Sequence, residues 1–219
     1  MTTNNGCVAT RASSFTVNGD IPVSNFNALN PATMCANDSI AIQDASTVNF
    51  GSVTKVEIYW DNVNFPAVFQ TDDFPTPGKI YRHLYPNFQA PLTRSFNIRY
   101  RAYSGATCVD DRIKTIVVNA APKVQFNNMP DACLDAAPFQ ITQASEIGAV
   151  PGTGVFSGPG VNATGIFNPA LVGPGTYTIK YTFTSTAGGC IDSLSKTITV
   201  LDSASALSLI HISEPTRPY

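Results

Sequence analysis

The sequence predicts an all-β protein made of two antiparallel β-sandwiches in tandem. Three observations support this fold class. Apolar and polar residues alternate with a period of two in several segments, helical periodicity is close to absent, and Gly- and Pro-rich turn signals separate the segments. The length of 219 residues suits one large or two ordinary domains. Many short strands joined by such turns are typical of sandwiches.

The alternating segments are the expected strands. Residues 177–184 read Tyr-Thr-Ile-Lys-Tyr-Thr-Phe-Thr, which places Tyr181 on the apolar side. Residues 96–103 place Tyr100 on the apolar side in the same way, and residues 55–60 do so for Trp60. We therefore predict that each segment has one buried and one solvated face.

Turn signals lie between these strands, at residues 75–78, 157–160, 173–175 and 188–189. The Gly-rich stretch 152–160 also suggests hairpin turns. It lacks the Lys-Ser/Thr pair and the following helix that a phosphate-binding loop requires.

An internal repeat defines the domains. The ten residues after Cys108 and after Cys190 share Asp at the second position, Lys-Thr-Ile at the sixth to eighth and Val at the tenth. Cys7 begins a weaker copy, with Val at the tenth position. Because the copies are a whole domain apart, we predict sandwiches at residues 19–120 and 121–202. Two copies of about 80–100 residues fit the size of an immunoglobulin-like domain.

The two ends of the chain fall outside these domains. Residues 1–18 are interpreted as the last strand of a truncated preceding domain. Residues 203–219 are interpreted as a linker followed by LSLIHISEPTRPY, which resembles the translation of a transposon-end adapter from sequencing libraries. A genuine disordered tail is the alternative, and the segment is set aside in either case.

Composition excludes several classes of function. The net charge of −2 and the absence of a basic cluster speak against a nucleic-acid partner. No apolar run is long enough for a membrane span, and no signal peptide is visible at the start. Two histidines, His83 and His211, leave little material for His-based catalysis, so we expect no enzyme activity and no cofactor.

Five cysteines suggest a disulfide framework. Each predicted domain has one early cysteine and one in its last hairpin, so we expect the pairs Cys35–Cys108 and Cys133–Cys190. Cys7 is then unpaired because of the truncation. Disulfides indicate an oxidising, extracytoplasmic location, whereas five reduced cysteines in a cytosolic protein are the alternative.

Several segments resemble a known family. Residues 58–61 (Ile-Tyr-Trp-Asp), 81–85 (Tyr-Arg-His-Leu-Tyr) and 96–100 resemble landmarks of PKD domains, although the family's Gly-Asp-Gly turn is absent after Asp61. Residues 152–190 are similar to PKD-like and immunoglobulin-like modules of large Bacteroidetes surface proteins. The resemblance implies a secreted, cell-surface repeat protein. Such proteins often use type IX secretion and serve adhesion or gliding, and the secretion signals would lie outside this sequence.

Candidate site residues have competing interpretations. Trp60 is expected to be a core residue near a disulfide, with sugar stacking as the alternative. His83, between Tyr81 and Tyr85, is expected to pack structurally. Aspartates 61, 72, 73, 110 and 111 could hold structural calcium, but no calcium-loop spacing appears and solvated loops are favoured. Arginines 94, 99, 101 and 112 could form an anion-binding face, but ion pairing with acidic residues is favoured.

We therefore expect a non-catalytic extracellular repeat module, acting as a structural spacer or in adhesion. Its expected partners are neighbouring repeats of the same chain, surface glycans and other cell-surface proteins. The alternative is a carbohydrate-binding accessory module of a secreted hydrolase.

Overall fold

The structure is a computed structural model, which describes residues 6, 8, 10–14 and 20–203. The adapter-like tail and most of residues 1–18, Cys7 included, lie outside the described residues. The chain divides into two compact units, Met1–Ala120 and Ala121–Tyr219.

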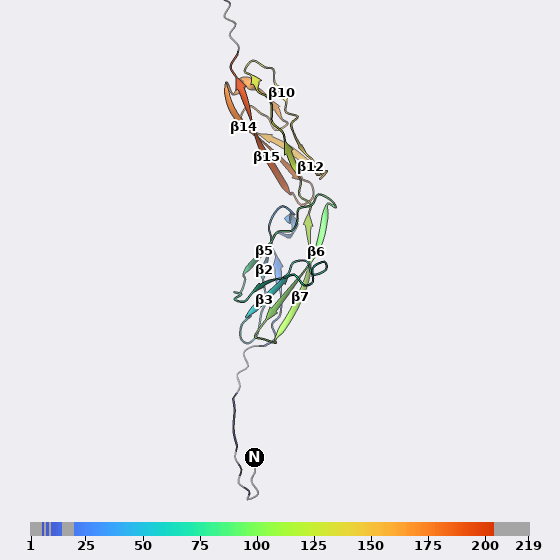
Figure 1. Cartoon of the computed structure of the whole chain (residues 1–219), viewed down its shortest axis with the longest axis vertical. Helices are drawn as coiled ribbons and strands as arrows, with labels where there is room; N and C mark the ends of the chain where they lie inside the picture. The colour runs from blue at the N-terminus through green and yellow to red at the C-terminus, as the bar shows by residue number, and fades with distance from the viewer. Residues whose placement is uncertain (1–5, 7, 9, 15–19, 204–219) are drawn as a thin grey trace, which may run out of the picture. The chain divides into compact units, whose positions relative to one another are not determined.

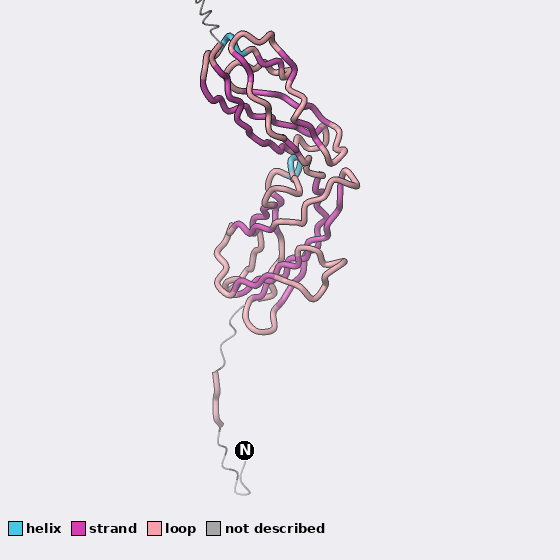
Figure 2. The backbone as a smooth tube through the Cα atoms, turned by 45° about the horizontal axis from the view of Figure 1, so that its top comes forward, coloured by secondary structure: helices cyan, strands magenta, loops and turns pink. Residues whose placement is uncertain are grey.

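Strands make up nearly all the regular structure of the described chain (Figures 1 and 2). Its helical part consists of two 3-10 turns, η1 (Pro31–Thr33) and η2 (Pro169–Leu171). In the part of the chain that the structure describes, no helix is long and apolar enough to cross a membrane.

The first unit contains two antiparallel sheets. The smaller sheet has the order β1-β2-β5 and the larger one β4-β3-β6-β7. Their bounds are β1 (Phe26–Ala28), β2 (Ile40–Asp44), β5 (Ile80–His83), β4 (Gln70–Asp72), β3 (Lys55–Tyr59), β6 (Thr93–Tyr103) and β7 (Val109–Asn119).

Aromatic residues from both sheets form the core of the first unit. The ring of Tyr100 on β6 lies 5.7 Å from that of Phe26 on β1 and 6.2 Å from that of Tyr81 on β5. Tyr100 is fully buried, as are Ile98 and Val56 on its sheet. The two sheets therefore pack face to face as a sandwich.

The second unit has a four-stranded sheet of order β12-β14-β15-β9 and two small pairs, β8 with β11 and β10 with β13. The main strands are β12 (Gly152–Ser157), β14 (Gly175–Ser185), β15 (Ile191–Leu201) and β9 (Ala132–Cys133). The small pairs are β8 (Val124–Phe126) with β11 (Ala144–Glu146) and β10 (Phe139–Gln140) with β13 (Ile166–Phe167).

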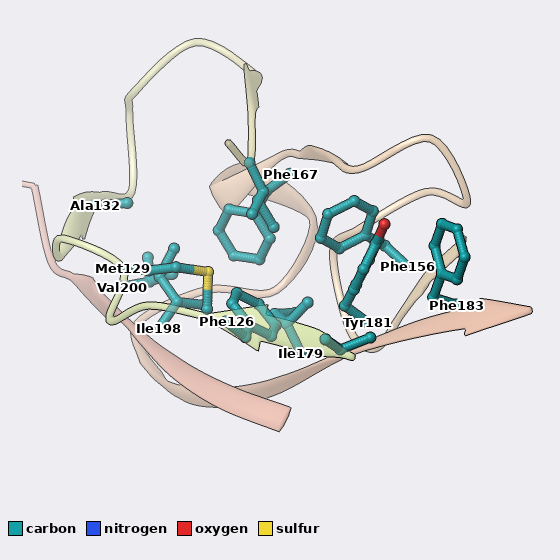
Figure 3. Close-up of a cluster of buried hydrophobic side chains, with 12 residues drawn as sticks. Phe126, Met129, Ala132, Phe156, Phe167, Ile179, Tyr181, Phe183, Ile198 and Val200 are labelled. Carbon is teal, nitrogen blue, oxygen red and sulfur yellow. The ribbon is translucent and has the colours of Figure 1, made fainter. Parts of the chain in front are cut away.

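Large aromatic side chains fill the core of the second unit (Figure 3). Phe156 on β12 contacts Tyr181 on β14 and Phe126 on β8, with ring centroids 4.8 and 6.3 Å apart. Phe167 and Ile179 are fully buried in the same cluster. Both units are thus immunoglobulin-like antiparallel β-sandwiches, as the alternation of residues predicted.

Two local expectations are wrong. The stretch 152–157 is strand β12 rather than a turn, because it pairs with β14. Gly152 and Gly154 have to be small there, where the strand passes close to the Thr184 carbonyl oxygen and the Tyr181 side chain. On β3, Glu57 and Tyr59 are buried although they alternate with the core residues. Lys55 and Tyr103 contact Glu57, and the Phe69 ring and the Arg99 guanidinium pack on Tyr59.

The expected disulfide pairs are wrong as well. Among the described cysteines, Cys35 and Cys190 are disulfide-bonded, whereas Cys108 and Cys133 are free thiols. Each expected pair included one cysteine that is free in the structure.

The strand pairing explains this outcome. Cys35 forms a parallel bridge with Asn119 at the end of β7, whereas Cys108 directly precedes the start of that 11-residue strand. At about 3.3 Å per residue, the two cysteines lie roughly 36 Å apart along the strand, far beyond disulfide reach. In the second unit, Cys133 pairs with Leu201 at the end of β15, and Cys190 precedes its start.

Candidate functional site

The first unit contains a large groove with a mainly aromatic and apolar lining. Its volume is about 870 Å³. The lining comes from the end of β3 and the loop after it, the end of β5, and the segment that leads into β6. The lining residues are Trp60, Asp61, Asn64, Phe65, Val68, Phe69, Gln70, His83, Tyr85, Pro86, Pro91, Thr93, Arg94, Ser95 and Phe96.

A continuous stack of four rings lines one side of the groove. Trp60 lies parallel to His83, with centroids 4.9 Å apart and an interplanar angle of 12°. His83 meets Tyr85 edge to face at 4.6 Å. Tyr85 in turn stacks on Phe96 at 3.9 Å. Such contacts stabilise the rings beyond the burial of their area, so this wall is preformed.

Hydrogen bonds fix the stack to the backbone. The Tyr85 hydroxyl donates to the carbonyl oxygen of Trp60 at 2.6 Å. The Trp60 indole N–H donates to the side-chain oxygen of Gln70, at the start of β4, at 3.1 Å. Both buried polar groups are thereby satisfied, so neither ring offers a free donor to the groove.

The loop after β3 forms a rim of the groove. Phe65, Val68 and Phe69 are 59, 65 and 47% exposed and line the groove. The loop is held by its own bonds, because Asp61 accepts from the backbone N–H of Asn64 at 3.2 Å and from its side-chain amide at 2.8 Å. The rim is therefore an ordered loop that presents apolar side chains to solvent.

The titratable groups of the groove are poor candidates for catalysis. Burial lowers the pKa of His83, so this side chain favours its neutral form at physiological pH. Burial, with a smaller contribution from the charge of Asp61, raises the pKa of Tyr85 and keeps its hydroxyl protonated. In the described part of the chain, neither residue is hydrogen-bonded to a serine, cysteine or carboxylate, as a nucleophile–base pair would require.

Arg94 is the cation of the groove. Its Nη2 donates to the carbonyl oxygen of Ala90 at 2.9 Å, and its guanidinium lies 4.3 Å from the ring centroid of Phe88. No carboxylate lies within 4.0 Å of it in the described chain, where the ion pairs involve Lys55, Lys79, Arg99 and Arg101. The guanidinium therefore keeps donors for an external anion.

Ion pairs occupy the outer face of the larger sheet. Arg99 and Arg101 both bind Asp111, at 2.6 and 2.7 Å, so these two arginines are paired with an acidic residue as favoured from the sequence. Burial would raise the pKa of Asp111, but hydrogen bonds from the two arginines hold it at about 2. Burial would also raise the pKa of Glu57, but hydrogen bonds led by that from Lys55 lower it below its usual value.

Of the five aspartates considered for calcium, Asp61, Asp72, Asp110 and Asp111 bind protein groups. Asp72 accepts from Lys79 and Tyr81, and Asp110 accepts from the backbone N–H of Ser24. In the described part of the chain, no group of three or more His, Cys, Asp or Glu side chains is arranged to hold a metal.

The structure brings together only some of the residues singled out in the sequence. Trp60, His83 and Tyr85 form one wall of the groove, whereas Tyr100 and Tyr181 lie in the cores of the first and second units. Trp60 is buried and packs on His83. The sequence analysis did not identify the rim residues Phe65, Val68 and Phe69. The run of apolar residues at 65–69, in a loop, could have indicated an exposed apolar surface.

Comparisons with known proteins find distant similarities to solved structures alone. No protein-family model and no curated protein matches. The fibronectin(III)-like modules of CbhA from Clostridium thermocellum are 16% identical over 81% of this chain and 95% of that one, with a TM-score of 0.34. Drosophila N-cadherin EC1-4 is 13% identical over 84% of this chain and 51% of that one, with a TM-score of 0.29. At these values the similarities carry no information on ligand, partner or activity.

Proposed function

We propose that the chain is a non-catalytic extracellular repeat module, which serves as a spacer or in adhesion on a bacterial surface. The observation that carries this proposal is that both units end in the same element, an antiparallel hairpin of two 11-residue strands. In each unit, an Asp two residues after the cysteine binds the first segment of the same unit. Repetition of one structural unit is how modular arrays are built.

Two further observations support an extracellular location. Cys35 and Cys190 are disulfide-bonded, which is typical of oxidising compartments. The resemblance of residues 152–190 to modules of Bacteroidetes surface proteins also supports an extracellular location. On the same ground, type IX secretion is the proposed secretion route. Neighbouring repeats and other cell-surface molecules are the proposed partners, with neither a cofactor nor nucleic acid.

The decisive test is the sequence of the complete gene together with the location of its product. We expect further copies of the Cys-x-Asp-x3-Lys pattern, spaced like those at Cys108 and Cys190. We also expect antibodies against residues 20–203 to label intact cells. A catalytic domain on the same chain, or labelling only after lysis, would overturn the proposal.

The aromatic groove favours a second candidate function, that of a carbohydrate-binding module attached to a secreted hydrolase. Aromatic rings and a few polar groups are the usual lining of ligand sites. Binding on a glycan array that disappears on substitution of Phe69 would support it. The ring faces of Trp60 and Tyr85 are already covered by neighbouring rings, which makes this candidate the weaker one.

A further inference from the structure

We infer that the groove of the first unit binds a peptide segment with a large apolar side chain followed by a carboxylate. The site would be a specific recognition surface on the protein. This inference goes beyond the proposed function, since it concerns the purified protein and does not depend on where the protein acts or how many repeats it has.

The exposed apolar rim is the first step of the argument. Phe65, Val68 and Phe69 line a single groove and are each about half exposed or more. An exposed cluster of large apolar side chains around a preformed concavity is typical of an interaction site. A side chain that enters the groove would cover these residues and the ring stack together.

The hydrogen-bonding state of the lining distinguishes an apolar occupant from a sugar. A sugar has many hydroxyl groups, and each needs a partner when it is desolvated. Three polar side chains of the groove are engaged within the protein, because Gln70 accepts from Trp60 and Asn64 donates twice to Asp61. An apolar side chain needs no such partners, so it suits this lining better.

The positive charge of Arg94 favours an occupant that carries a carboxylate. Arg94 has no ion-pair partner among the described residues, and its Nη2 is fixed by the Ala90 carbonyl. The Asp61 carboxylate in the same groove is turned to its own loop, where Asn64 satisfies both of its oxygens. A carboxylate on the occupant would therefore complement Arg94, and a charge-assisted pair with arginine is among the stronger hydrogen bonds.

The chain offers its own reporter for the test, because Trp60 is its only tryptophan and belongs to the wall of the groove. Trp60 emission would be followed during titration of residues 1–219 with two tripeptides, N-acetyl-Leu-Phe-Asp-amide and N-acetyl-Leu-Phe-Asn-amide. We expect saturable binding of both, with the Asp peptide about tenfold tighter, as one arginine–carboxylate pair of about 1.4 kcal/mol would give.

Two variants and one matched control make the result specific. Phe69→Ser should weaken both peptides at least about tenfold. Arg94→Gln should remove the preference for the Asp peptide. Phe74→Ser removes a phenylalanine that is 86% exposed outside the groove, and it should change neither affinity. The circular dichroism spectra of all variants should match that of the parent.

Three outcomes would overturn the inference. One is that neither peptide changes Trp60 emission at millimolar concentration. Another is that Phe74→Ser weakens binding as much as Phe69→Ser does. The third is that cellohexaose binds saturably in the groove while the peptides do not, which would assign the site to a glycan. None of these outcomes bears on whether the gene encodes further repeats, so failure here is distinguishable from failure of the proposed function.

Discussion

The side chain of Asp110 accepts a hydrogen bond from the backbone N–H of Ser24 at 2.8 Å and so ties β7 to the first segment of its unit. Asp192 accepts from the backbone N–H of Val124 at 2.7 Å in the second unit. Both aspartates stand two residues after a cysteine in the sequence repeat. The aspartate shared by the two copies of the repeat therefore has a structural role, which is to hold the first and last parts of each sandwich together.

Removing this carboxylate should destabilise each unit separately. Asp110→Ala and Asp192→Ala each leave a backbone N–H without its charged acceptor, which costs about 1–3 kcal/mol in the free energy of unfolding. Urea unfolding of the full chain, followed by circular dichroism, measures the loss. Asp131→Ala is the matched control, because this aspartate is exposed. Equal stability of the Asp110, Asp192 and Asp131 variants would contradict the role.

The repeated lysine has a related position. Lys114 donates to the carbonyl oxygen of Phe26, and Lys196 donates to the side-chain oxygen of Asn128 at 3.0 Å. Both lysines thus reach from the last strand to the first segment of their own unit. The shared Asp and Lys of the repeat act on the same junction, which explains why this part of the two hairpins is the most similar in sequence.

The parts of the fold set by local alternation were predictable. The inward side of 96–102 is buried in the structure from Ile98 to Ala102, and Ile179, Tyr181 and Phe183 are buried in the same way. Period-two alternation depends only on neighbours along the chain and on which face meets the core. The fold class therefore follows from the sequence.

Features that depend on contacts between distant segments were not predictable. Cys35 lies beside the end of β7, where it forms a parallel bridge with Asn119. The spacing of cysteines in the sequence does not show which end of the strand lies beside Cys35. The groove has the same origin, since its wall and rim come from three separate segments. Trp60 and His83 could be named as aromatic landmarks, but not as stacked neighbours.

The two glycines of β12 should differ in their tolerance of a methyl group. A Cβ at Gly152 would lie 2.2 Å from the backbone oxygen of Thr184, whereas a Cβ at Gly154 would meet the Tyr181 side chain at 2.0 Å. Backbone can yield less than a side chain, so Gly152→Ala should lower stability by about 3 kcal/mol and Gly154→Ala by less. Thermal unfolding measures both changes. Thr153→Ala, on the neighbouring exposed position, serves as the control, and a larger loss for Gly154→Ala would contradict the argument.

The oxidation states of the cysteines can be checked by labelling. Iodoacetamide added to the unreduced, unfolded protein should modify Cys108 and Cys133, whereas Cys35 and Cys190 should react only after reduction. In the folded protein, Cys133 should react faster, because it is exposed and Cys108 is only partly so. Peptide mapping by mass spectrometry reads out each site. A disulfide-linked peptide containing Cys35 and Cys108 would contradict the structure.

Acid should weaken the ion pairs on the outer face of the larger sheet. The pKa of Asp111 is about 2 and that of Glu57 is lowered, so folding favours their ionised forms. Their contribution to stability is complete above the ordinary carboxyl pKa of about 4 and is lost as the pH falls from there toward 2. Asp111→Asn should flatten the decline in urea stability between pH 4 and 2.5, whereas the exposed Asp73→Asn should not. Parallel declines in the parent and both variants would contradict this assignment.

His83 and Trp60 should report on each other during an acid titration. Burial lowers the pKa of His83, so its NMR midpoint should lie below 6.5. The native state favours the neutral ring, so the contribution of His83 to stability is complete above its ordinary pKa of about 6.5 and is lost as the pH falls from there through the lower native pKa. Because the two rings stack at 4.9 Å, protonation should also quench Trp60 emission. His83→Gln should abolish this quenching step and His211→Gln should leave it unchanged. A step that persists in His83→Gln would show that the stacked pair is not its origin.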